Sequence, residues 1–179
     1  GSTTNKSFLI DVLSRERFAK GEATTAFIAE EFSADDLTPP APSLAQAAMA
    51  AVMHYTVQRR RAQASSLNVS PLLMDWASAG PLATRYVYDF DGGEFDVTVS
   101  PRRQGGYVVR HGDGQVVIEV MECGDNTARL VVDGRRQSVL YSAPGAGILD
   151  LSIDGQSLHF RNRIAFAASA EATAGGGHV

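Results

Sequence analysis

The sequence predicts an α+β fold in which a long apolar helix is enclosed by an eight-stranded antiparallel β-barrel, with a short helical N-terminal segment in front of it. The first observation is a helix-length run at residues 44–57, interrupted only by Gln46, His54 and Thr56. A surface helix is apolar on one face, so a helix that is apolar on every side must be enclosed. The second observation is a long series of strand-like segments after residue 84, which can supply the enclosure. The 14-residue run is too short to cross a bilayer.

The N-terminal segment, residues 1–32, contains two short helical patterns. The first has four apolar residues on one face. Thr24 or Thr25 can cap the second, because a hydroxyl there accepts a hydrogen bond from an otherwise unpaired amide. The segment has too little apolar surface to fold alone.

Residues 33–43 form an acidic linker with three prolines, which prevent a helix from continuing through it. Ser43 is a suitable N-cap for a helix over residues 44–63. The three arginines at 59–61 are expected at a solvated helix end, where their charge complements the negative pole of the helix.

Residues 65–83, which we call the arm, show neither the helical nor the strand period. A connection of this length is usually functional or disordered, and its high apolar content argues against disorder. Two alternatives remain, namely packing on the mouth of the barrel or binding to a partner protein. The residues expected to make partner contacts are Leu67, Val69, Pro71, Leu72, Leu73, Met74 and Trp76.

The barrel is expected over residues 84–163. Asp-Gly pairs such as Asp133-Gly134 and Asp154-Gly155 supply the positive backbone dihedrals that tight hairpins require. Alternation gives each strand one buried face, as where Val97 and Val99 alternate with polar residues. Closure into a barrel removes the exposed edges of so long a meander. The expected strands are 84–90, 94–100, 106–110, 115–122, 127–132, 136–142, 147–153 and 156–162.

Composition narrows the function classes. A chain of 179 residues is long enough for one domain with a real core. Its net charge of −4 gives no global attraction to nucleic acid or to anionic membranes, so neither is expected as a partner. Cys123 is the only cysteine in the sequence, which excludes an internal disulfide and favours a cytoplasmic or mitochondrial matrix location.

The sequence carries no recognisable catalytic motif. Its four histidines are scattered, with no metal-ligand spacing, and its glycine clusters lack the lysine of a phosphate-binding loop. Lys6 and Lys20 are the only lysines, so a lysine-attached cofactor is not expected in the helix or barrel. We therefore expect no catalytic, cofactor-binding or metal site in this chain.

The opening stretch resembles the end of the biotin carboxylase domain in α subunits of biotin-dependent acyl-CoA carboxylases. The matching residues are Asn5, Phe8, Leu9, Phe18, Gly21, Thr25, Phe27 and Ile28. The helix, arm and strands resemble, in order and layout, the domain that these subunits place between biotin carboxylase and the biotin carrier. That domain is known as BT, for biotin carboxylase–carboxyltransferase interaction. The resemblance implies a BT-type domain at 44–165 and, at 166–179, a linker to a biotin carrier domain.

The resemblance further implies a role in assembly rather than catalysis. In the family the arm hooks onto the carboxyltransferase β subunit, while the sites for biotin, ATP and Mg lie in other domains of the α subunit. This fragment would hold biotin carboxylase and its biotin arm against the carboxyltransferase, and it would be inactive alone. The short tail after the last strand is more similar to methylcrotonyl-CoA carboxylases, which we favour, and the segment before residue 33 also suits propionyl-CoA carboxylases.

The sequence leaves two alternative functions. A small-ligand barrel of lipocalin type would require an empty lumen, against which the apolar helix argues. An enzyme built from dispersed polar residues would use side chains such as Asp150, His159 and Arg161, although their spacing gives no support.

Overall fold

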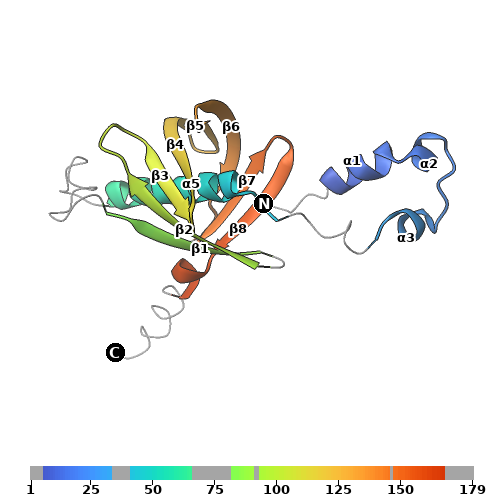
Figure 1. Cartoon of the computed structure of the whole chain (residues 1–179), viewed down its shortest axis with the longest axis horizontal. Coiled ribbons are helices and arrows are strands. Elements are labelled where there is room, and N and C mark those ends of the chain that lie inside the picture. Colours follow the sequence, from blue (N-terminus) through green and yellow to red (C-terminus); the bar gives the residue numbers. More distant parts are fainter. Residues whose placement is uncertain (1–5, 34–40, 66–81, 91–92, 146, 168–179) are drawn as a thin grey trace.

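The eight strands close into one antiparallel barrel. In the computed structural model, which describes residues 6–33, 41–65, 82–90, 93–145 and 147–167, each strand pairs with its neighbour in sequence and β8 pairs back onto β1 (Figure 1). The predicted eight-stranded antiparallel barrel is thereby confirmed. The strands are β1 (Thr84–Phe90), β2 (Gly93–Pro101), β3 (Tyr107–His111), β4 (Gly114–Cys123), β5 (Thr127–Val132), β6 (Arg135–Ser142), β7 (Ile148–Ile153) and β8 (Gln156–Asn162).

Local sequence explains the hairpins. Asp133 and Gly134 adopt φ values of 46° and 82° in the two-residue turn between β5 and β6. Asp154 and Gly155, at 50° and 83°, form the equivalent turn between β7 and β8. Turns with positive φ at both central residues match the twist of the flanking strands, which is why they set the pairing register. Alternation then directs one face inward, so that Val97 and Val99 are both fully buried.

One helix, α5 (Leu44–Ser65), runs through the barrel (Figure 1). Ser43 caps it as predicted: its Oγ accepts from the Gln46 N–H at 3.2 Å, and Gln46 Oε1 accepts from the Ser43 N–H at 2.8 Å. Four alanines of α5 have no exposed surface, which lets the barrel wall approach the helix closely. From Arg59 onward the helix is largely exposed. The buried residues of α5 are Ala47, Ala48, Met49, Ala50, Ala51, Val52, Met53, His54 and Val57.

The shared core joins this helix to the inner faces of all eight strands. Large inward-facing side chains from different strands, including Tyr86, Ile118 and Leu149, belong to a single hydrophobic cluster with the helix residues. Side chains of this size fill the space that the small helix residues leave, as close packing requires. The interior is therefore a packed core rather than a channel.

Three short helices precede the barrel: α1 (Lys6–Ser14), α2 (Glu16–Ala19) and α3 (Phe27–Glu31). Their small core consists of Val12, Phe27 and Phe32, with Phe8 packed against it. The prediction that Thr24 or Thr25 caps α3 was wrong. Ala26 occupies the N-cap position without a side-chain hydrogen bond, and Thr24 Oγ1 instead accepts from the Ala26 N–H at 3.3 Å.

The seam between β1 and β8 closes the barrel with few backbone pairs. Only two pairs join these strands, Tyr88 with Asn162 and Asp89 with Arg161. The buried side chain of Asn162 extends the seam, because its Oδ1 accepts from the N–H groups of Val87 at 3.3 Å and Ile164 at 3.2 Å.

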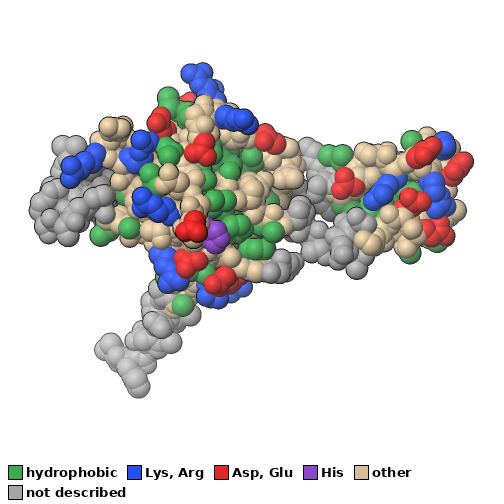
Figure 2. Space-filling view, in the orientation of Figure 1, with side chains coloured by type: hydrophobic (Ala, Val, Ile, Leu, Met, Phe, Trp, Pro, Cys, Tyr) green, Lys and Arg blue, Asp and Glu red, His purple; other side chains and the backbone are tan. Residues whose placement is uncertain are grey.

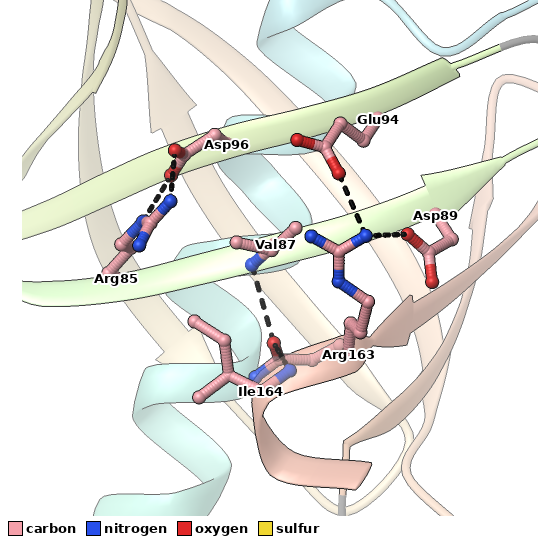
Figure 3. Close-up of polar contacts among 8 residues, drawn as sticks. Arg85, Val87, Asp89, Glu94, Asp96, Arg163 and Ile164 are labelled. Carbon is pink, nitrogen blue, oxygen red and sulfur yellow. Dashed lines mark hydrogen bonds and ion pairs between the residues drawn. The ribbon is translucent and has the colours of Figure 1, made fainter. Parts of the chain in front are cut away.

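Charged pairs cover the outside of the seam (Figure 3). Arg163 Nη1 lies 3.1 Å from Glu94 and 3.6 Å from Asp89, and Arg85 makes two hydrogen bonds to Asp96. The Arg163 pairs tie the short helical turn at 163–167 to β1 and β2, whereas the Arg85–Asp96 pair joins β1 to β2. Residues 163–167, which follow β8, are therefore held against the outside of β1 and β2.

Candidate functional site

The barrel interior offers no space for a small ligand. The helix α5 occupies it, and its side chains form one hydrophobic cluster with the inner faces of the strands. A lipocalin-type function needs an empty lumen. The structure therefore argues against the small-ligand alternative.

The interior does hold one buried titratable group, His54, which is 3% exposed. Its Nδ1 lies 2.8 Å from the Tyr88 hydroxyl, and its ring stacks on Tyr86 and Tyr88 at 5.8 and 5.6 Å. Burial, with a smaller contribution from Arg61, lowers the pKa of His54 to about 4, while the nearby main chain of Ile148 opposes the shift. Burial also raises the pKa of Tyr88, whose hydroxyl therefore keeps its proton and can donate it to His54. This histidine is therefore a residue of the core.

The C-terminal end of α5 is clamped to the barrel rim, which the sequence did not reveal. Arg60 donates to the carbonyls of Cys123 and Gly124, and Arg61 donates to the Ala143 carbonyl at 2.6 Å. Both arginines are exposed, as expected of a solvated helix end, and in addition they bind these loop carbonyls. Loop carbonyls at the rim are good acceptors for a guanidinium, and each such charge-assisted bond is stronger than a neutral one.

A tyrosine reinforces the same rim. The Tyr141 hydroxyl donates to the Gly124 carbonyl at 2.5 Å and lies 3.5 Å from Cys123 Sγ. Burial, followed by the contact with Cys123, raises the pKa of Tyr141 to about 12, so the hydroxyl stays protonated as a donor. The point at which the arm leaves the helix is thus held to two loops of the barrel.

The predicted partner-binding residues fall outside the described part of the chain, which omits residues 66–81. The described ends of the arm are Ser65, in the last turn of α5, and Leu82, which is 58% exposed shortly before β1. The arm residues that stay predictions are Leu67, Val69, Pro71, Leu72, Leu73, Met74 and Trp76.

Of the three residues weighed for catalysis, the structure brings two together. His159 Nδ1 lies 2.6 Å from Asp150 Oδ1 on the outside of the wall. The guanidinium of Arg161 instead lies over the Phe166 ring, 4.2 Å from its centroid. The Asp–His pairing could have been found from the sequence, because the two-residue turn at Asp154 and Gly155 places residues 150 and 159 opposite each other.

A hollow of about 300 Å³ lies beside this pair, on the outer face of β6, β7 and β8. Leu140, which is 57% exposed, is one of the residues that line it. The lining combines outward-facing side chains such as Ser142 and Asp150 with buried ones such as Tyr141 and Leu151. The lining residues are Asn126, Leu140, Tyr141, Ser142, Asp150, Leu151, Ser152, Ser157, Leu158 and His159.

Among the described residues, no group of three or more His, Cys, Asp or Glu side chains is placed to hold a metal ion. None of the described helices has the length and apolar content needed to span a bilayer. On the face drawn in Figure 2, charged side chains of both signs are scattered over the barrel.

The three N-terminal helices present an apolar surface of their own. Leu9, Ile10 and Leu13 are 51%, 51% and 58% exposed on α1, and Phe18 and Ile28 are also exposed. Large aliphatic side chains gathered on so small a unit are typical of a surface that another part of a protein covers.

Comparison with known proteins agrees with this architecture. Residues 47–173 match the family model described as propionyl-coenzyme A carboxylase BT domain. The propionyl-CoA carboxylase alpha chain of Ruegeria pomeroyi (strain ATCC 700808 / DSM 15171 / DSS-3) is 33% identical over 134 residues. That similarity covers 73% of this chain and 19% of the relative, so the chain spans about a fifth of the relative's length.

Proposed function

This chain belongs to the propionyl-coenzyme A carboxylase BT domain family, and from that premise we propose that it is a non-catalytic assembly domain of a biotin-dependent acyl-CoA carboxylase α subunit. Its role is to dock biotin carboxylase and the biotin arm onto the carboxyltransferase β subunit. Holding the parts together matters because carboxybiotin must pass between two separate active sites. Tethering turns that transfer into an encounter at high effective concentration.

The observation that carries the proposal is the clamped end of the enclosed helix. Arg60 and Arg61 bind carbonyls of two rim loops, so the start of the arm has a fixed position relative to the barrel. A fixed root limits the conformational entropy that a binding segment loses when it meets its partner. The barrel thus acts as a rigid base for a partner-binding segment.

The other proposed contacts are with further domains of the same α subunit. The apolar surface around Leu9, Ile10 and Leu13 is suited to packing against the rest of a biotin carboxylase domain, to which we assign residues 1–32. Biotin, ATP and Mg would be held by those other domains and not by this fragment. The proposed location of the parent enzyme is a bacterial cytoplasm or a mitochondrial matrix.

The test of the assembly role is binding to the carboxyltransferase subunit. In the 179-residue chain, replacing Leu72, Leu73 and Trp76 together with alanine is expected to weaken this binding by at least about 2 kcal/mol, roughly thirtyfold. The physical reason is that large apolar anchors contribute most of the energy of such interfaces. Isothermal titration calorimetry with the purified carboxyltransferase subunit measures the dissociation constant.

Thermal unfolding of the same triple variant separates binding from folding. A melting temperature within a few degrees of the original chain is expected if the arm is not part of the core. If the variant is unfolded, the arm belongs to the core and the partner contacts lie elsewhere. If the unaltered chain does not bind the carboxyltransferase subunit at all, the assembly role is refuted.

The acyl-CoA substrate is a separate proposal. The sequence of the tail favours methylcrotonyl-CoA, whereas the descriptions of the family model and of the relative both name propionyl-CoA carboxylase. The matches to the family model and to the relative cover far more of the chain than the short tail does. We therefore infer that propionyl-CoA is the better substrate of the parent enzyme. The expected result is a higher kcat/KM for propionyl-CoA than for methylcrotonyl-CoA in the holoenzyme, and the reverse ranking would restore the methylcrotonyl assignment.

A further inference from the structure

We propose that the hollow on the outer face of β6, β7 and β8 is a second contact point for the carboxyltransferase subunit. It would take an aliphatic side chain of that subunit which is flanked by a basic residue. This inference rests on the proposed assembly role and adds to it a docking surface on the barrel wall.

The position of the hollow supports this occupant. Ser142, in its lining, directly precedes Ala143, whose carbonyl accepts from Arg61. Asn126, also in the lining, belongs to the loop that begins at Gly124, whose carbonyl accepts from Arg60. The hollow therefore opens beside the rim where α5 ends and the arm begins. A partner bound next to Ser65, at the end of α5, would lie close to this wall.

The size of the hollow favours a side chain over a free small molecule. Its volume of about 300 Å³ lies at the lower limit of pockets that enclose ligands, which span roughly 300–1,000 Å³. Leu140, which is more than half exposed, lines it together with the hydroxyl side chains of Ser142, Ser152 and Ser157, and Ser152 lies opposite Leu140 on the neighbouring strand. Exposed apolar side chains beside polar ones are common in protein–protein contacts.

The charge of the lining specifies the chemistry next to the anchor. Asp150 is the only Asp, Glu, Lys or Arg among the lining residues, and its side chain is 24% exposed while hydrogen bonded to His159. A partly exposed carboxylate beside an exposed apolar side chain such as Leu140 favours a cation in the facing surface of a partner. We therefore expect a lysine or arginine of the carboxyltransferase subunit near Asp150.

The test uses two variants of the 179-residue chain. Leu140→Asp replaces the exposed apolar side chain with a charge, and Leu140→Ser replaces it with a small hydroxyl side chain, with little risk to folding because Leu140 is exposed. Both are expected to weaken binding to the carboxyltransferase subunit, Leu140→Asp by about tenfold or more. Met121→Asp is the matched control, since Met121 is 63% exposed on β4 and lies outside the lining of this hollow.

A third variant, Asp150→Asn, tests the basic neighbour. It is expected to weaken binding and to reduce the salt dependence of the dissociation constant, because one ion pair across the interface is lost. If Leu140→Asp binds as tightly as Met121→Asp while the arm variant fails to bind, the hollow is not a contact and the assembly role stands. If the unaltered chain does not bind, both proposals fail together. If the Asp150→Asn variant binds the carboxyltransferase subunit more tightly, that subunit has no lysine or arginine near Asp150.

Discussion

Replacing Asn162 with alanine is expected to lower the free energy of unfolding by about 3 kcal/mol. The amide oxygen of Asn162 accepts hydrogen bonds from the main chain of Val87 and of Ile164, and the asparagine is 3% exposed. Alanine would leave the buried Val87 N–H without an acceptor at the seam, where only two residue pairs join β1 to β8. A buried donor without an acceptor costs roughly 1–3 kcal/mol, and the lost packing adds to that cost.

Urea unfolding at neutral pH measures the change, with Asn126→Ala as the control. Asn126 is exposed in the loop between β4 and β5, so its replacement is expected to alter stability by no more than about 0.5 kcal/mol. Amide hydrogen exchange gives a second reading, because the Val87 amide should exchange faster in Asn162→Ala. Equal stability of the two variants would mean that the backbone pairs alone hold the seam.

Acid is expected to destabilise the chain through His54 by up to about 3 kcal/mol. The pKa of this buried imidazole is lowered to about 4 from an ordinary value of 6.5. The unfolded chain therefore takes up a proton at a higher pH than the folded chain does. The contribution to stability is fully present above pH 6.5, and it is lost progressively as the pH falls from 6.5 to about 4.

His54→Asn isolates this effect from the carboxylates that also titrate in acid. Asparagine keeps an oxygen that can accept the Tyr88 hydroxyl, and it does not take up a proton in this range. The difference in unfolding free energy between the two proteins, measured by urea titration from pH 8 to pH 4, should be constant above pH 7 and then shift in favour of the variant. A difference that stays constant down to pH 4 would show that the imidazole is protonated without penalty.

Strands and turns were predictable because their causes are local. All eight strands lie within one residue of the expected bounds at each end, since alternation and Asp-Gly turns act over a few residues. The helix was predictable because its sequence is apolar on every side. It continues to Ser65 instead of residue 63, because its exposed last turns depend on helix propensity and on the rim contacts of Arg60 and Arg61.

Features that join distant segments could not be predicted in the same way. The bond between Asn162 and Val87 depends on how the barrel closes, and the hollow around Leu140 depends on the packing of three strands. The Asp150–His159 pair is an intermediate case, because its register follows from a nearby turn while its role depends on what surrounds it.

The enclosure of α5 constrains the order in which the molecule can assemble. The chain continues from both ends of this helix, so a ring that had already closed could admit the helix only if a chain end were threaded through it. Protein chains avoid such threading. The first and last strands must therefore meet after the helix is in place, and the amide of Asn162 completes a structure whose centre has formed before its outer boundary.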